Sequence, residues 1–190
     1  MQDLWQLPKA LRLGEKNWDI RADFRVMLRV IFTLERQELP EAGRIYLAMR
    51  LFYKDFLQMP PALWADAAKE LMSFLAGGRE QPGPAGPRLL DWQQDAELII
   101  ADVNKAAGRE LRAMEFVHWW TFLALFSSVG EGRLSAVVNI RRKLAEGTAL
   151  EDWEKEYLRR EPWRVKLRAS LTPEEQAHKE QLQKMLDKKE

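Results

Sequence analysis

Apolar residues recur at three- and four-residue steps along most of this chain, which is the spacing of one buried helix face. In the first half, these stripes predict helices over about 22–36, 45–56 and 61–75. In the second half, they predict helices over about 91–107, ending at Gly108, and 134–147, ending at Gly147. Another helix is expected from a capping box at Thr148, with Pro162 breaking it.

A different pattern occurs near the N-terminus, where apolar and polar residues alternate. Leu11–Leu13 and Asn17–Ile20 flank the turn residues Gly14-Glu15-Lys16, which is typical of a short β-hairpin. An isolated hairpin is marginal in water, so we expect this one to lie against the helices.

The most apolar stretch is Met114–Phe126, which places large apolar groups on nearly every face when wound into a helix. A helix that is apolar all round is typical of a protein interior or a membrane. This stretch is too short for a bilayer, which requires roughly 20 apolar residues. We therefore predict a mainly α fold, a single helical domain around this buried central helix. Arg112 stands where a better N-cap would be favoured.

Two segments interrupt this pattern. Seven of the twelve residues in 77–88 are Gly or Pro, which predicts a mobile surface loop within a helical domain spanning 1–171. Thr172-Pro173-Glu174-Glu175 is a strong helix start. The helix it predicts, 172–190, is polar and is expected to be loosely attached.

Composition excludes several function classes. The formal net charge is +1, and the basic runs near Arg141 and Arg159 are interleaved with acidic residues, so the charge pattern argues against nucleic acid as a partner. The absence of cysteine excludes disulfides and thiolate chemistry. The first residues carry no basic region followed by an apolar run, so no signal peptide is predicted.

Two Glu-x-x-His spacings, Glu115–His118 and Glu175–His178, match a spacing that di-iron helical bundles use. Further glutamates would be needed, and Glu97 is the best of a weak set. We favour the alternative, in which His118 is a core imidazole with hydrogen-bond partners. There is no phosphate loop and no nucleophile elbow. The sequence thus predicts a protein that is not an enzyme and has no cofactor and no metal.

Three motifs resemble the bacteriophage Gp-fifteen family. Ala22-Asp23-Phe24-Arg25 is similar to the entry into its first helix, and Asp91–Ile99 resembles the segment after its variable loop. Glu115–Phe126 resembles its most distinctive run, and Ile140-Arg141 resembles a later hydrophobic-Arg pair. The resemblance covers about Leu7–Leu167 and leaves out the predicted C-terminal helix.

The resemblance implies a tail assembly chaperone of long-tailed phages, working in the host bacterial cytoplasm. It would bind the tape-measure protein, and in some cases the tail-tube protein, with no catalytic residue and no membrane partner. Whether the chain forms a homo-oligomer stays an open question at this point. One alternative is a structural tail component retained in the virion. A second, less favoured, is a di-metal helical-bundle oxidase or storage protein.

The segment from Trp153 to Leu186 is the predicted partner-binding region. Its polar final helix gains little from packing on its own core, so we expect it to become ordered against an apolar partner or another copy of the chain. The alternative is a solubilising tail that binds nothing. The residues predicted to contact the partner are Trp153, Trp163, Leu182, Met185 and Leu186.

Overall fold

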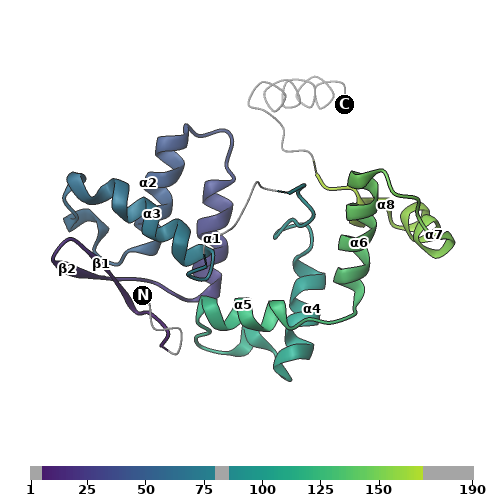
Figure 1. The fold of residues 1–190 in the computed structure, drawn as a ribbon. Helices are drawn as coiled ribbons and strands as arrows, with labels where there is room; N and C mark the ends of the chain where they lie inside the picture. The colour runs from purple at the N-terminus through teal and green to yellow at the C-terminus, as the bar shows by residue number, and fades with distance from the viewer. Residues whose placement is uncertain (1–5, 80–85, 169–190) are drawn as a thin grey trace, which may run out of the picture.

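A computed structural model describes residues 6–79 and 86–168 (Figure 1). The fold is mainly α with an N-terminal β-hairpin, as predicted. Its elements are β1 (Ala10–Leu13), β2 (Lys16–Asp19), α1 (Phe24–Leu34), α2 (Glu41–Phe52), η1 (Phe56–Gln58), η2 (Pro61–Leu63), α3 (Trp64–Leu75), α4 (Ala96–Ala107), η3 (Leu111–Ala113), α5 (Trp119–Ser127), α6 (Arg133–Glu146), α7 (Asp152–Arg160) and α8 (Pro162–Val165).

The hairpin confirms the alternating pattern. β1 and β2 pair antiparallel, with Leu13 opposite Lys16, so the turn consists of two residues, Gly14 and Glu15. Gly14 has φ +60°, and a positive φ at this position suits the tight turns that match strand twist. Leu11, Leu13 and Trp18 are buried, and β1 lies against α3.

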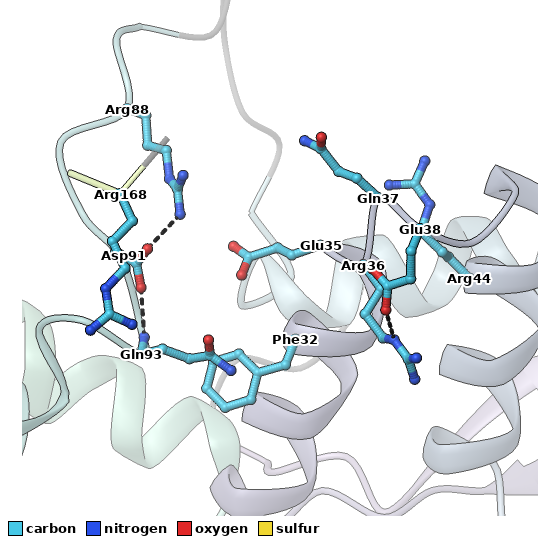
Figure 2. A pocket seen from close by; sticks show the side chains of 10 residues that line it. All are labelled: Phe32, Glu35, Arg36, Gln37, Glu38, Arg44, Arg88, Asp91, Gln93 and Arg168. Carbon is cyan, nitrogen blue, oxygen red and sulfur yellow. Dashed lines mark hydrogen bonds and ion pairs between the residues drawn. The ribbon is translucent and has the colours of Figure 1, made fainter. Parts of the chain in front are cut away.

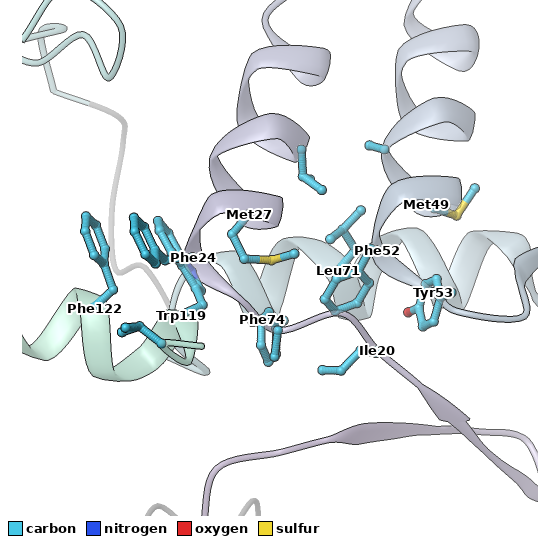
Figure 3. Close-up of a cluster of buried hydrophobic side chains, with 14 of the residues drawn as sticks. Ile20, Phe24, Met27, Met49, Phe52, Tyr53, Leu71, Phe74, Trp119 and Phe122 are labelled. Carbon is cyan, nitrogen blue, oxygen red and sulfur yellow. The ribbon is translucent and has the colours of Figure 1, made fainter. Parts of the chain in front are cut away.

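Aromatic and aliphatic side chains from both halves of the sequence form one contiguous core. Figure 1 shows the hairpin and α1–α3 on one side, α4 and α6–α8 on the other, and α5 between them. Phe24 of α1 stacks on Phe122 of α5, with ring centroids 4.8 Å apart (Figure 3). α5 thus connects the two groups of helices through the core.

Several predicted boundaries are confirmed in the second half. Gly108 and Gly147 end α4 and α6 in the left-handed conformation, which glycine adopts at little cost. Pro162 separates α7 from α8. The capping box predicted at Thr148 is wrong, because α7 begins later: Glu151 is the N-cap, and its amide donates to the Glu154 carboxylate.

The central helix is shorter than predicted, and this part of the prediction is wrong. α5 begins at Trp119, whereas Met114–His118 is not helical: the chain bends at Met114 and Glu115, and His118 forms a β-bridge to Asp23. In a helix, the backbone groups of this segment would bond to one another. Here they bond to the residues at the start of α1: Phe24 N donates to Val117 O, and Trp119 N donates to Ala22 O. Phe116, predicted to be buried, is 55% exposed.

The start of α4 also differs from the prediction. The helix begins at Ala96, and Asp91 caps a turn before it by accepting from the amides of Gln93 and Gln94. Asp95 completes this arrangement, because its carboxylate accepts from the Asp91 amide.

A buried ion pair joins α4 to α6. Arg141 and Asp95 are 5% and 1% exposed, and their guanidinium and carboxylate groups meet at 2.6 Å and 2.8 Å. The other donors of Arg141 reach the carbonyls of Leu89, Arg164 and Val165. All five N–H groups of the guanidinium are therefore satisfied, and one side chain joins three separate stretches of chain.

The predicted loop at 77–88 has neither helix nor strand in its described parts, 77–79 and 86–88. Its middle, and the predicted helix at 172–190, lie outside the described residues. Among the helices of residues 6–79 and 86–168, none has the length and apolarity needed to span a bilayer.

We predict that Arg141→Met lowers the free energy of unfolding by about 3–5 kcal/mol, because it leaves the Asp95 carboxylate buried without its counter-charge. The control is Lys155→Met, which removes an exposed pair with Asp152 and should cost less than about 1 kcal/mol. Urea titration of both variants measures the difference. Equal midpoints for the two would contradict a structural role for the buried pair.

Candidate protein-binding surface

The candidate site is built on the non-helical segment 114–118, which the N-terminus of α1 holds in place. We call it the extended segment, because the backbone is extended at Met114 and at His118. Asp23 caps α1 by accepting from Arg25 N at 2.9 Å, and its other oxygen accepts from Val117 N at 3.0 Å. The Arg25 guanidinium pairs with the same carboxylate at 2.9 Å. It also donates to the carbonyls of Leu111, Arg112 and Met114, the last at 2.6 Å. We call Asp23 and Arg25 the clamp.

His118 ends the extended segment and caps α5. Its Nδ1 accepts from Trp120 N at 3.1 Å, so the ring proton is on Nε2, which donates to Pro8 O at 3.1 Å. Burial lowers the pKa of His118, and the hydrogen bond to Pro8 offsets this only in part. The imidazole thus connects the chain before β1 to the start of α5 in its neutral form.

The two tryptophans that follow His118 bind the end of another helix. Trp119 Nε1 donates to Leu75 O, and Trp120 Nε1 donates to Phe74 O, each at 3.0 Å. These carbonyls lie in the last turn of α3, where backbone acceptors have no partner within the helix. The His-Trp-Trp run therefore caps one helix at its start and another at its end.

The di-metal hypothesis finds no support in this geometry. Both ring nitrogens of His118 are hydrogen-bonded, and Glu115 is exposed. Glu97 is also exposed and lies 3.6 Å from Arg164. Within the described residues, no three His, Cys, Asp or Glu side chains gather as a metal site would require. Glu175 and His178 lie outside those residues.

An apolar groove lies beside the extended segment. It has a volume of about 360 Å³, and we call it the Phe116 groove. Phe116 and Leu7 are exposed beside it, on backbone that the clamp and His118 hold. Large apolar side chains fixed in this way are typical of protein-binding surfaces. The lining residues are Leu7, Ala107, Arg109, Leu111, Met114, Phe116, Val117, His118, Thr121 and Leu125.

Two further hollows lie on the side of α1 and α2. The first, the Met72 groove, is apolar, measures about 400 Å³ and is lined by Leu34, Glu41, Arg44, Ile45, Ala68, Lys69, Leu71 and Met72. The second, the charged cleft, measures about 480 Å³ and is lined by Phe32, Glu35, Arg36, Gln37, Glu38, Arg44, Arg88, Asp91, Gln93 and Arg168 (Figure 2).

Opposite charges in the charged cleft largely pair with one another. Arg36 bonds to Glu38, and Arg88 bonds to Asp91. Glu35 differs, because burial raises its pKa more than the nearby Arg88 lowers it. The cleft therefore lacks the uniform charge that would select an anion or a cation.

The structure places the sequence-predicted contact residues away from these hollows. Trp153 of α7 and Trp163 of α8 are exposed, and neither lines the two grooves or the cleft of the described chain. Their role stays a prediction. The other three, Leu182, Met185 and Leu186, lie outside the described residues.

The basic residues near the two tryptophans are largely paired. Lys143 bonds to Glu154, Arg159 to Glu156, and Arg164 to Glu161. These contacts make a largely ion-paired surface, which reduces the positive charge available to a phosphate backbone.

The sequence reasoning missed Phe116, Leu7 and the clamp as parts of one site. The apolar pattern predicts Phe116 as part of the buried helix, and Asp23-Phe24-Arg25 predicts only a helix entry. Asp23 is recognisable from the sequence as an N-cap, but no local signal shows that Asp23 and Arg25 also bond to the segment before α5.

Comparison with known proteins identifies the family. A family model described as Bacteriophage Gp15 protein matches residues 4–167. The chain belongs to this family. No curated protein and no solved structure gives a significant match. All lining residues of the Phe116 groove fall inside the range that the Gp15 model matches.

The motifs that resemble the Gp15 family pair up in space. The clamp joins Ala22–Arg25 to Glu115–Phe126, and the buried ion pair joins Asp91–Ile99 to Ile140-Arg141. The motifs thus correspond to the two polar junctions of the fold.

We predict that stability falls as the pH drops below about 6.5, the ordinary pKa of histidine. Below this pH the unfolded chain takes up a proton at His118, whereas the folded chain resists it because its pKa is lowered. Above it both states are neutral and stability is fully present.

The test compares His118→Asn with the parent by urea titration between about pH 8 and pH 5.5. Asparagine also caps helices and does not titrate, so the parent should lose more stability on acidification than the variant. His178 is present in both proteins and cancels. Parallel stability curves would contradict the assignment.

Proposed function

We propose that this Gp15-family chain is a non-enzymatic tail assembly chaperone. It binds the tape-measure protein in the host cytoplasm while the tail tube forms, and the Phe116 groove receives an apolar helical segment of this client. The observation that carries the proposal is Phe116 itself, a large apolar side chain left 55% exposed on backbone fixed by the clamp.

The groove's chemistry supports a helical apolar client. Its floor includes Leu111, Met114, Val117 and Leu125, and Arg109 is its charged member apart from the neutral His118. An amphipathic helix binds such a groove through apolar anchors spaced at three and four residues. Long helical proteins expose such stripes before assembly, and covering them prevents aggregation.

The small size of the groove supports a complex from which the client can be released. A hollow of about 360 Å³ holds a few anchor side chains, not a whole helix face. Interfaces that bury less than about 1,200 Å² are typical of transient complexes. A chaperone that must give up its client to tail-tube subunits needs an affinity of this kind.

The test is co-expression of the full chain with the tape-measure protein, followed by copurification. Phe116→Asp introduces a charge at the groove and should reduce the captured client at least tenfold. The matched control is Leu57→Asp, since Leu57 is 75% exposed and lines neither of the two grooves nor the charged cleft. Both variants should keep the parent's urea midpoint, because both sites are on the surface.

Client capture that is equal in the two variants would contradict the groove assignment. Failure of the parent chain to keep the tape-measure protein in the supernatant would contradict the chaperone function itself.

A further inference from the structure

The Met72 groove is a second apolar surface that the Phe116 groove does not explain. It lies where the end of α1 meets α2 and α3, and Leu34, Ile45 and Leu71 line it. Met72 is 55% exposed at this groove. Methionine is a flexible apolar side chain that adapts to the shape of a bound segment.

The described chain ends at the charged cleft, which adjoins this groove through Arg44. Arg168, the last described residue, lines the charged cleft, and Arg44 lines both the cleft and the Met72 groove. Figure 2 shows Arg168 and Arg44 on opposite sides of the cleft. Gln94 fixes the exit of the chain there, because its side chain accepts from Arg168 N at 2.9 Å and donates to Lys166 O at 2.8 Å.

The remaining sequence has the apolar pattern that the groove requires, and it begins at the adjoining cleft. Leu182, Met185 and Leu186 are spaced as the apolar stripe of a helix. In a helix starting at Thr172, Leu182 lies about 15 Å from that start. The residues between Arg168 and Thr172 add roughly 10 Å when extended. A tail of this length, roughly 25 Å up to Leu182, leaves from Arg168, which lines the cleft that shares Arg44 with the groove.

Arg44 supplies an independent reason for a polar partner at the same place. One of its terminal nitrogens donates to Leu34 O at 3.1 Å, but its buried Nε has no acceptor among the described residues. A buried donor without an acceptor costs free energy. Glu174 and Glu175 stand between Arg168 and Leu182, so a tail that crosses the cleft carries two carboxylates toward Arg44.

We infer that the C-terminal segment 172–190 docks as a helix in the Met72 groove of its own chain. Leu182, Met185 and Leu186 pack against the groove, and a carboxylate of Glu174 or Glu175 accepts from Arg44. The occupant is the same chain because a tethered segment is present at an effective concentration in the millimolar range. This docking goes beyond the proposed function and uses different residues.

The absence of cysteine allows a direct test by disulfide formation in the full chain. A disulfide requires the two Cα atoms to be within about 7 Å. Under mild oxidation, Met72→Cys with Leu186→Cys should form an intramolecular disulfide at a rate independent of protein concentration. The matched control, Leu57→Cys with Leu186→Cys, should form it at least tenfold more slowly. Adding Leu182→Asp to the first pair should reduce its rate to that of the control.

Equal rates for the two pairs would overturn the inference. Disulfide-linked dimers that increase with protein concentration would also overturn it, by showing a second copy in the groove. A rate unaffected by Leu182→Asp would rule out the apolar stripe as the docking surface. This test changes no residue of the Phe116 groove and uses no client protein. Its results therefore do not depend on whether the client binds the Phe116 groove.

Discussion

The fold depends on one carboxylate that bonds in three directions. Asp23 caps α1, pairs with Arg25 and accepts from Val117 N, a residue 94 positions away in the sequence. Arg25 in turn satisfies three carbonyls of the segment that leads to Val117. Partly buried backbone groups need partners, and here a neighbouring helix entry provides them in place of helical hydrogen bonds. The position of α5, and with it the Phe24–Phe122 stack, follows from this junction.

A second polar junction joins separate segments in the other half of the chain in the same way. Asp95 and Arg141 are almost fully buried, and Arg141 also bonds to carbonyls before α4 and in α8. Buried ion pairs add little net stability compared with apolar packing, but losing one partner is costly. The two junctions therefore fix which segments meet, while the aromatic core supplies most of the favourable free energy.

Local signals in the sequence predicted the elements whose causes are local. The hairpin turn at Gly14, the helix ends at Gly108 and Gly147, and the break at Pro162 all depend on backbone preferences of single residues. The extent of the central helix does not depend on such single-residue preferences. Met114–Val117 is apolar enough for a buried helix, and what makes it extended is the clamp, which local periodicity cannot detect.

The same limit explains the candidate site. Phe116 was predicted to be core because its neighbours are apolar, and its exposure follows only from the extended backbone that the clamp imposes. Trp153 and Trp163 were nominated because large aromatics in a charged stretch suggest a partner. They are exposed, but neither lines the Phe116 groove, the Met72 groove or the charged cleft, so these three hollows do not support that prediction.

The central claim is that the clamp holds the segment presenting Phe116 in one rigid conformation. Amide hydrogen exchange of the free chain, measured residue by residue, tests it most directly. The account predicts that the amides of Val117 and Trp119, bonded to Asp23 and to Ala22 O, exchange only through unfolding of the whole protein. Exchange of these two amides as fast as in an unstructured peptide would contradict it.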